Sequence, residues 1–397
     1  MRLVLLAGSC AVALLGAIGC DDYHIAGPNA RYPEPVTDVA GAPHWVLEGF
    51  SSSGQPVGYP VAELTWTPPP SWDQEVFRVY SRRSGQSSYY LVGTIGSCSV
   101  NGCVYRDRDV SAGRSYDYYV STYDDRRDLE TESTVDVTVR IPSSTSPATP
   151  LPDTTVSLDG SAFVRWRDGG VGKALWKYLV YITRVDAAPY NYRVGETDGA
   201  SFLDGRAANG HVYAYRVAAV DSLEHVSALS SELVAAPRPD AYGELIYSWQ
   251  TGASQSGFRF QADENTNPIV AGSAASAQWR FEAAAAGWRI VPLGGTQLLQ
   301  YPNRTTALSC GPGADAGCRA ATRAPATGYQ ASPLTVTPEY SYVFRVTGDD
   351  GQTHYGVLRV AILGSDGSGH DLMIFDWAYQ LLPNDVRLST ARTGTAP

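Results

Sequence analysis

Short runs in which apolar and polar residues alternate, separated by turn residues, dominate the chain. A period of two is the pattern of a half-buried β-strand, because successive side chains point to opposite faces of a sheet. Between Glu34 and Ile141 such runs recur at the spacing of an antiparallel sandwich, at residues 64–66, 76–80, 89–92 and 116–120. Long helical patterns are missing, and Tyr (25) and Trp (9) are abundant. The sequence therefore predicts an all-β protein.

The same frame returns about 100 residues later. Trp66 recurs as Trp166, and the pattern Gly-x-x-Tyr-x-Tyr-x-Val that contains Tyr116 recurs around Tyr213. A repeat of this length indicates a tandem domain and not a solenoid unit. A proline-rich stretch between the two copies predicts a semi-extended linker. The expected segments are one domain at 36–141, the linker at 142–152, a second domain at 153–237 and a C-terminal domain at 240–390.

At these residues the chain resembles bacterial fibronectin type III domains, in which a Trp on the second strand fills the core and a Tyr three residues after a Gly enters the sixth strand. The resemblance implies two immunoglobulin-like β-sandwiches in tandem, with Trp66 and Trp166 as structural core residues. It also implies that Tyr116 and Tyr213 are tyrosine-corner residues, each burying its ring while its hydroxyl reaches the backbone.

One loop of the first copy, Asp-Asp-Arg-Arg-Asp at 124–128, lies before the last strand at an end of the predicted sandwich. Loops at such ends often carry binding residues. A solvated turn is the simpler interpretation of a mixed-charge loop, and we prefer it at this point.

Residues 240–390 show a different alternating pattern and predict an antiparallel β-rich domain. The hairpin at 342–360, followed by 374–380, resembles the last strands of the HmuY-like family of surface lipoproteins, some of which bind haem. The resemblance implies axial side-chain ligands, and the candidates here are His354 and His370, with Met373 as a further one. Ordinary loop histidines are the alternative interpretation.

Three aromatic residues of this domain, Tyr329, Tyr340 and Trp377, are candidate contacts for a ligand if they form an exposed platform. Burial in a core is the more common fate of aromatic side chains in alternating strands.

The N-terminal residues 1–19 have the pattern of a secretory signal peptide, with Arg2 ahead of an apolar run at 3–18. Ala-Ile-Gly before Cys20 resembles the lipobox of bacterial lipoproteins, which implies that Cys20 is acylated and becomes the mature N-terminus. Ala17 and Gly19 also satisfy ordinary signal cleavage at the same bond, which would release a secreted protein. Residues 20–35 would form the lipidated N-terminus and a flexible spacer.

The chain has six cysteines, and signal cleavage would remove Cys10. Acylation of Cys20 would leave two close pairs in an oxidising compartment, which favours the lipobox interpretation over plain secretion. We predict disulfides that close short loops, Cys98 with Cys103 and Cys310 with Cys318. A metal site would need more Cys or His nearby in sequence, so no metal ligand is predicted.

The net charge of −10 excludes nucleic acid as an expected partner. The Gly-x-Ser-x-Gly and His-Glu-x-x-His motifs are absent, and no acidic residue lies in a recognisable catalytic frame. We therefore predict no catalytic residues, no enzyme activity and no cofactor other than the haem that the HmuY-like resemblance implies.

Together these features predict an outer-membrane lipoprotein of the cell envelope, exposed at the surface or facing the periplasm. It would be a non-catalytic binding or adhesion protein that contacts a glycan or protein, with the two sandwiches as its stalk. One alternative is a haem or metal scavenger that acts through the C-terminal domain. A second alternative is a structural spacer in a surface assembly.

Overall fold

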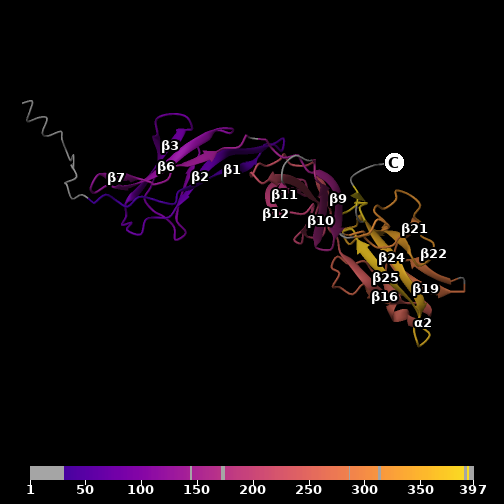
Figure 1. The fold of residues 1–397 in the computed structure, drawn as a ribbon. Helices are drawn as coiled ribbons and strands as arrows, with labels where there is room; N and C mark the ends of the chain where they lie inside the picture. The colour runs from indigo at the N-terminus through magenta and orange to yellow at the C-terminus, as the bar shows by residue number, and fades with distance from the viewer. Residues whose placement is uncertain are drawn as a thin grey trace, which may run out of the picture. The chain divides into compact units, whose positions relative to one another are not determined.

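A computed structural model describes residues 31–143, 145–170, 175–285, 287–311 and 314–388, and the backbone of 391–392. The predicted signal peptide and Cys20 lie outside these residues. The chain divides into two compact units, the first holding most of the described residues up to 145 and the second most of those after it. Each unit is built from antiparallel sheets (Figure 1), and among the described residues no helix is long and apolar enough to span a membrane.

The first unit is a sandwich of two sheets. One has the order β1-β2-β5, with β1 at Ala40–Phe50, β2 at Pro56–Trp66 and β5 at Cys103–Asp107. The other has the order β4-β3-β6-β7, with β8 also paired to β6; its strands are β3 Val76–Arg83, β4 Tyr90–Ile95, β6 Ser115–Asp124, β7 Leu129–Glu132 and β8 Val137–Arg140. Alternate residues of both sheets, including Leu64, Trp66, Phe77 and Tyr118, meet in one core.

The second sandwich repeats this arrangement within the second unit. Its sheets are β13-β10-β9-β26 and β12-β11-β14-β15. The strands are β9 Leu151–Leu158, β10 Ser161–Arg167, β11 Leu175–Val185, β12 Ala188–Thr197, β13 Ser201–Asp204, β14 Tyr213–Asp221, β15 Leu233–Ala235 and β26 Ala391–Arg392. Its core contains Trp166, Tyr178 and Tyr215. The topology is that of an immunoglobulin-like, fibronectin type III-like sandwich in both copies.

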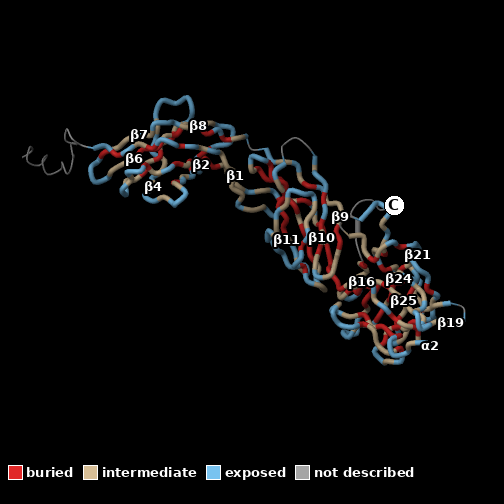
Figure 2. Tube along the Cα trace, turned by 60° about the horizontal axis from the view of Figure 1, so that its bottom comes forward, coloured by how far each residue is buried: buried red, intermediate tan, exposed pale blue. Residues whose placement is uncertain are grey.

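The C-terminal residues also form a sandwich, of two five-stranded sheets. The first sheet is β16-β25-β24-β23-β21, at Asp240–Tyr247, Asp371–Tyr379, Thr353–Ser365, Tyr340–Thr347 and Gln297–Arg304. The second is β18-β17-β19-β20-β22, at Ile269–Val270, Gly257–Phe258, Trp279–Ala284, Gly287–Pro292 and Leu334–Thr335. A single α-helical turn, α2 at Trp249–Gly252, precedes a 3-10 turn at Ala253–Gln255. The buried strand faces, red in Figure 2, enclose an aromatic core.

The second unit holds both the second and the C-terminal sandwich, so the compact units are fewer than the sandwiches. Arg238, expected to lie between domains, is buried and contacts Asp240 at 3.1 Å and the Leu388 carbonyl at 2.5 Å. The terminal strand β26 pairs with β9 of the second sandwich, at Ala391 with Thr155 and Arg392 with Thr154. The second and the C-terminal sandwich thus fall within one compact unit.

Candidate ligand-binding face

The sandwich residues singled out by the repeat lie where the fibronectin type III resemblance implies. Trp66 and Trp166 are buried in their cores. The Tyr116 hydroxyl accepts a hydrogen bond from the Ser111 backbone N–H at 3.0 Å. The Tyr213 hydroxyl accepts one from the Ala208 N–H, also at 3.0 Å. Both tyrosines therefore tie the start of their strand to the preceding loop.

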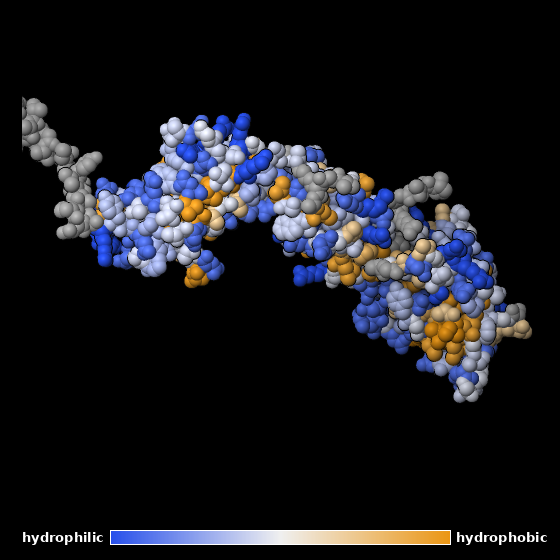
Figure 3. Space-filling model, viewed as in Figure 1, coloured by the Kyte–Doolittle hydropathy of each residue, from blue (hydrophilic) through white to orange (hydrophobic). Residues whose placement is uncertain are grey.

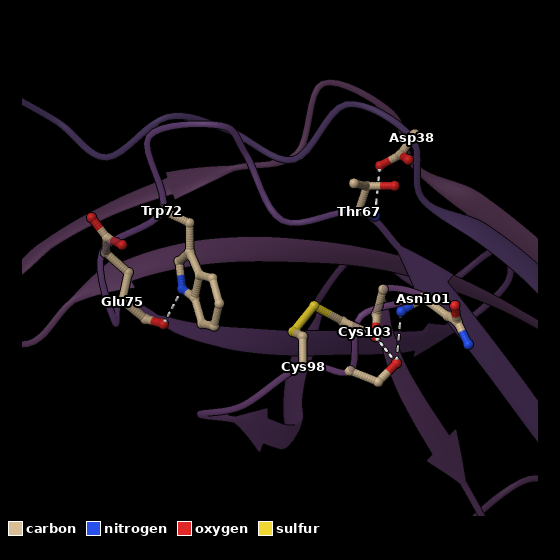
Figure 4. Close-up of a disulfide and its surroundings, with 9 residues drawn as sticks. Asp38, Thr67, Trp72, Glu75, Cys98, Asn101 and Cys103 are labelled. Atoms are coloured by element: carbon tan, nitrogen blue, oxygen red, sulfur yellow. Dashed lines mark hydrogen bonds between the residues drawn. A yellow bond between two sulfur atoms is a disulfide. The ribbon is translucent and has the colours of Figure 1, made fainter.

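The structure forms both cysteine pairs as disulfides. Cys98 and Cys103 have Cα atoms 4.5 Å apart and close the turn that leads into β5 (Figure 4). Cys310 and Cys318 have Cα atoms 5.8 Å apart. Both distances lie in the ordinary range for a disulfide.

The two histidines proposed as haem ligands do not meet. His354 is buried near the start of β24, with Nδ1 3.0 Å from the Gln380 carbonyl and Nε2 3.1 Å from Asp350. His370 follows the far end of the same strand, and its Nδ1 lies 3.2 Å from Asp366. A strand of this length separates its ends by about 40 Å, so the two side chains cannot bind one iron as axial ligands.

The remaining candidates of this domain do not form a ligand platform. Met373 and Trp377 belong to the buried core of the C-terminal sandwich, which is the fate that the alternating pattern favours for Trp377 over an exposed platform. Tyr329 is largely covered, with Arg345 4.2 Å from its ring centre, and Tyr340 packs partly against the core. Within the described ranges no group of three His, Cys, Asp or Glu residues could hold a metal ion.

A surface that sequence patterns did not single out lies on the first sandwich. We call it the tyrosine face and define it by Arg78, Tyr80, Arg82, Tyr89, Tyr119 and Tyr123. Its strand residues alternate with Phe77, Val79, Tyr118 and Val120, which are fully buried. The alternation of a strand therefore directs the face outward, away from the core.

Three of the rings are fixed by one another. Tyr80 and Tyr119 lie opposite each other in the β3–β6 ladder, and their rings stack with centroids 4.7 Å apart and planes 11° apart. Tyr89 meets Tyr119 edge-on at 4.8 Å. Each such aromatic pair contributes about 1 kcal/mol of stability in addition to what the burial of its apolar area contributes.

The arginines cover two ring faces and are themselves held by carboxylates. The Arg78 guanidinium lies 3.3 Å from the centre of the Tyr123 ring and donates to Glu130 at 2.8 Å. The Arg82 guanidinium lies 4.3 Å from the centre of the Tyr89 ring and donates to Asp117 at 3.1 Å. These contacts combine cation–π attraction with ion pairs, so both long side chains are restrained.

Most phenol groups of the face donate to acids. The pairs are Tyr80 with Glu130 at 2.9 Å, Tyr89 with Asp136 at 3.1 Å and Tyr123 with Asp128 at 3.0 Å. Burial, followed by the nearby Glu132 carboxylate, raises the pKa of Tyr119 to about 12. Burial and a bonded acid also raise the pKa values of Tyr80 and Tyr89. The phenols therefore remain protonated hydrogen-bond donors at neutral pH.

No protein-family model and no curated protein sequence matches the chain. Among solved structures, the FN1–FN3 domains of chicken CNTN1 are similar at 14% sequence identity and a TM-score of 0.34, over 52% of this chain and 68% of that chain. The assignment of the sandwich fold rests on the sheet order described above.

Proposed function

We propose that the protein is a non-catalytic binding or adhesion protein of the cell envelope, anchored through Cys20, that contacts a partner protein through the tyrosine face. The observation that carries the proposal is the packed array of four tyrosines and two arginines on an outward sheet face. The lipobox-like residues before Cys20 support the anchor.

The composition and rigidity of the tyrosine face favour protein recognition. Tyr and Arg are enriched in the residues that dominate binding energy at interfaces. Side chains already held by stacking and ion pairs lose little conformational entropy when a partner binds. The Tyr119 hydroxyl has no hydrogen-bond partner within the described part of the chain, so it is available to one.

The charge around the face indicates the kind of partner. Four carboxylates contact the tyrosine face, whereas it contains only two arginine cations, so acidic groups outnumber basic ones there. The carboxylates belong to Asp117, Asp128, Glu130 and Asp136. The surface of the first sandwich seen in Figure 3 is mostly hydrophilic, with small hydrophobic areas. An acidic, polar surface attracts a basic protein surface, which would speed association at low salt.

The test uses an array of purified cell-surface and matrix proteins, probed with labelled full-length chain. Tyr119→Ala removes the central ring and should weaken binding to each basic protein on the array at least tenfold. Truncating an interface residue of this kind costs about 2 kcal/mol of binding free energy. Tyr190→Ala is the matched control, because Tyr190 is 55% exposed on β12 of the second unit. Hits that Tyr119→Ala leaves unchanged, or that Tyr190→Ala weakens equally, would count against the proposal, as would an array without hits.

A further inference from the structure

A cleft with a volume of about 290 Å³ lies at one end of the first sandwich. Three segments line it: residues 31–34, the loop 71–75 between β2 and β3, and the loop 124–127 between β6 and β7. The volume is at the lower limit of small-molecule sites, so the cleft suits a ligand of one or two small rings. The last of these segments is the mixed-charge loop that the sequence alone favours as a solvated turn.

The cleft presents free hydrogen-bonding groups of both charge signs. Within the described part of the chain, the carboxylates of Asp73 and Asp125 and the guanidinium of Arg31 have no side-chain partner. Other lining groups are already engaged: Glu34 accepts from the Ser71 hydroxyl at 2.6 Å, and Asp124 accepts from the Arg126 backbone N–H at 3.0 Å. The unengaged groups are therefore the ones that a ligand can use.

The loop that carries Asp73 is held in place from inside the sandwich. The Trp72 indole N–H donates to the Glu75 carbonyl at 2.7 Å, and its ring stacks on Phe77 of the core with centroids 5.8 Å apart. Figure 4 shows this indole in the surroundings of the Cys98–Cys103 disulfide. The Arg126 guanidinium donates a hydrogen bond to the side-chain carbonyl of Gln74 at 3.5 Å, which joins the two loops across the cleft. The site is thus largely formed before a ligand arrives.

We propose that this cleft binds a saccharide through neighbouring hydroxyl groups. A hydroxyl both donates and accepts, so one sugar can donate to Asp73 and Asp125 while accepting from Arg31. A simple cation or anion would instead meet groups of its own sign. Tyr32, whose side chain is 62% exposed at the rim, offers an aromatic face to the apolar side of a sugar ring. The polar lining does not suit an apolar ligand.

The inference is independent of the tyrosine face and goes beyond the function proposed above. The cleft is lined by residues 31–34 and by two loops, whereas most of the tyrosine face comes from strands β3 and β6, and the two sites share no residue. A saccharide held in the cleft would make the protein a glycan-binding module as well as a protein-binding one.

A glycan microarray probed with labelled full-length chain, followed by titration of the best free saccharide, tests the proposal. We expect saturable binding that weakens at least tenfold in Asp125→Asn and in Tyr32→Ala. Two matched controls lie away from the cleft. Asp109→Asn changes an exposed acid that precedes the start of β6, whereas the cleft lies at the end of that strand. Tyr90→Ala removes the ring of a tyrosine that is 64% exposed. Both controls should bind as the parent does.

The tyrosine-face variant Tyr119→Ala distinguishes the two proposals, because it should keep saccharide binding and lose only the protein partner. An array with no signal above blank would overturn the saccharide proposal. A signal that persists in both cleft variants, or that falls equally in the controls, would overturn it as well.

Discussion

At the scale of single residues, the described part of the chain repeats the tyrosine corner in all three sandwiches. In the C-terminal sandwich the Tyr342 hydroxyl accepts from the Thr337 backbone N–H at 2.9 Å and donates to the Thr335 carbonyl at 3.1 Å. The residue three positions before each corner tyrosine has a left-handed backbone: Gly113 at φ 74°, Gly210 at φ 78° and Glu339 at φ 65°. In every copy the backbone N–H of this residue donates to the carbonyl of a residue later in the chain. The acceptors are Ile141 for Gly113, Pro237 for Gly210 and Val360 for Glu339.

The third corner shows why the sequence pattern was incomplete. The pattern Gly-x-x-Tyr-x-Tyr-x-Val fits Tyr116 and Tyr213 but not Tyr342, because Glu339 stands where the other copies have glycine and Phe344 where they have the second tyrosine. The left-handed conformation favours glycine but does not require it, provided that surrounding contacts offset the cost. The left-handed turn is therefore repeated in the third sandwich although the glycine is not.

We expect Tyr→Phe at each corner to lower the free energy of unfolding by about 1 kcal/mol, because it removes one hydrogen bond and leaves a backbone N–H without its acceptor. Tyr342→Phe should cost the most, since its hydroxyl both accepts and donates. Urea unfolding followed by tyrosine and tryptophan fluorescence measures the change. Tyr90→Phe, at an exposed site, is the control, and corner variants as stable as that control would contradict the assignment.

At the scale of elements, the first disulfide fixes the start of β5. Cys103 is buried and pairs in register with Trp66 of β2, and Ser99 and Gly102 form a β-bridge within the closed turn. The covalent bond therefore joins the turn to the strand that packs beside the core tryptophan. The second disulfide closes a loop in the other unit.

The double variant Cys98→Ser, Cys103→Ala should lower the free energy of unfolding of the first unit by about 2 kcal/mol. Chain-entropy arguments predict this value for so short a loop. Calorimetry of the full chain should show a lower transition temperature for that unit alone. Replacing Cys310 and Cys318 in the same way is the matched control, and it should affect only the second unit. Equal shifts of both transitions in either variant would show that the units do not unfold independently.

At the scale of the whole molecule, the proposed function depends on the tether at Cys20. Several acyl chains anchor a protein stably, whereas the alternative cleavage at the same bond would release it. A net charge of −10 keeps such a protein soluble beyond the membrane and opposes binding to anionic polymers.

Cys20→Ser should move the protein from the detergent phase to the aqueous phase in a detergent partitioning experiment, because the variant cannot be acylated. Mass spectrometry of the mature N-terminus should show loss of the lipid mass. Phe77→Leu, a conservative change in the first core, controls for folding and should stay in the detergent phase. Unchanged partitioning and unchanged N-terminal mass in Cys20→Ser would mean that the protein is secreted free.

Several features could be predicted from sequence because they are local or repeated. Alternation located strands such as β3 and β6, and the recurrence of Trp66 as Trp166 revealed the tandem sandwiches. Close spacing in the chain sufficed for both disulfides. By contrast, whether Trp377 or Tyr119 faces outward depends on what the opposing sheet covers, and alternation alone does not say which face that is.

The sequence by itself determined the class of the fold and the two repeated sandwiches, because both are written in neighbouring residues or in a repeated pattern. The membrane tether stays a prediction from the residues before Cys20. Only the tertiary structure decided the rest. It stacked Tyr80 on Tyr119, brought residues 31–34 beside 124–127, and set His354 and His370 at opposite ends of one strand. These relations join or separate residues through strand register and sheet packing, which no local spacing specifies.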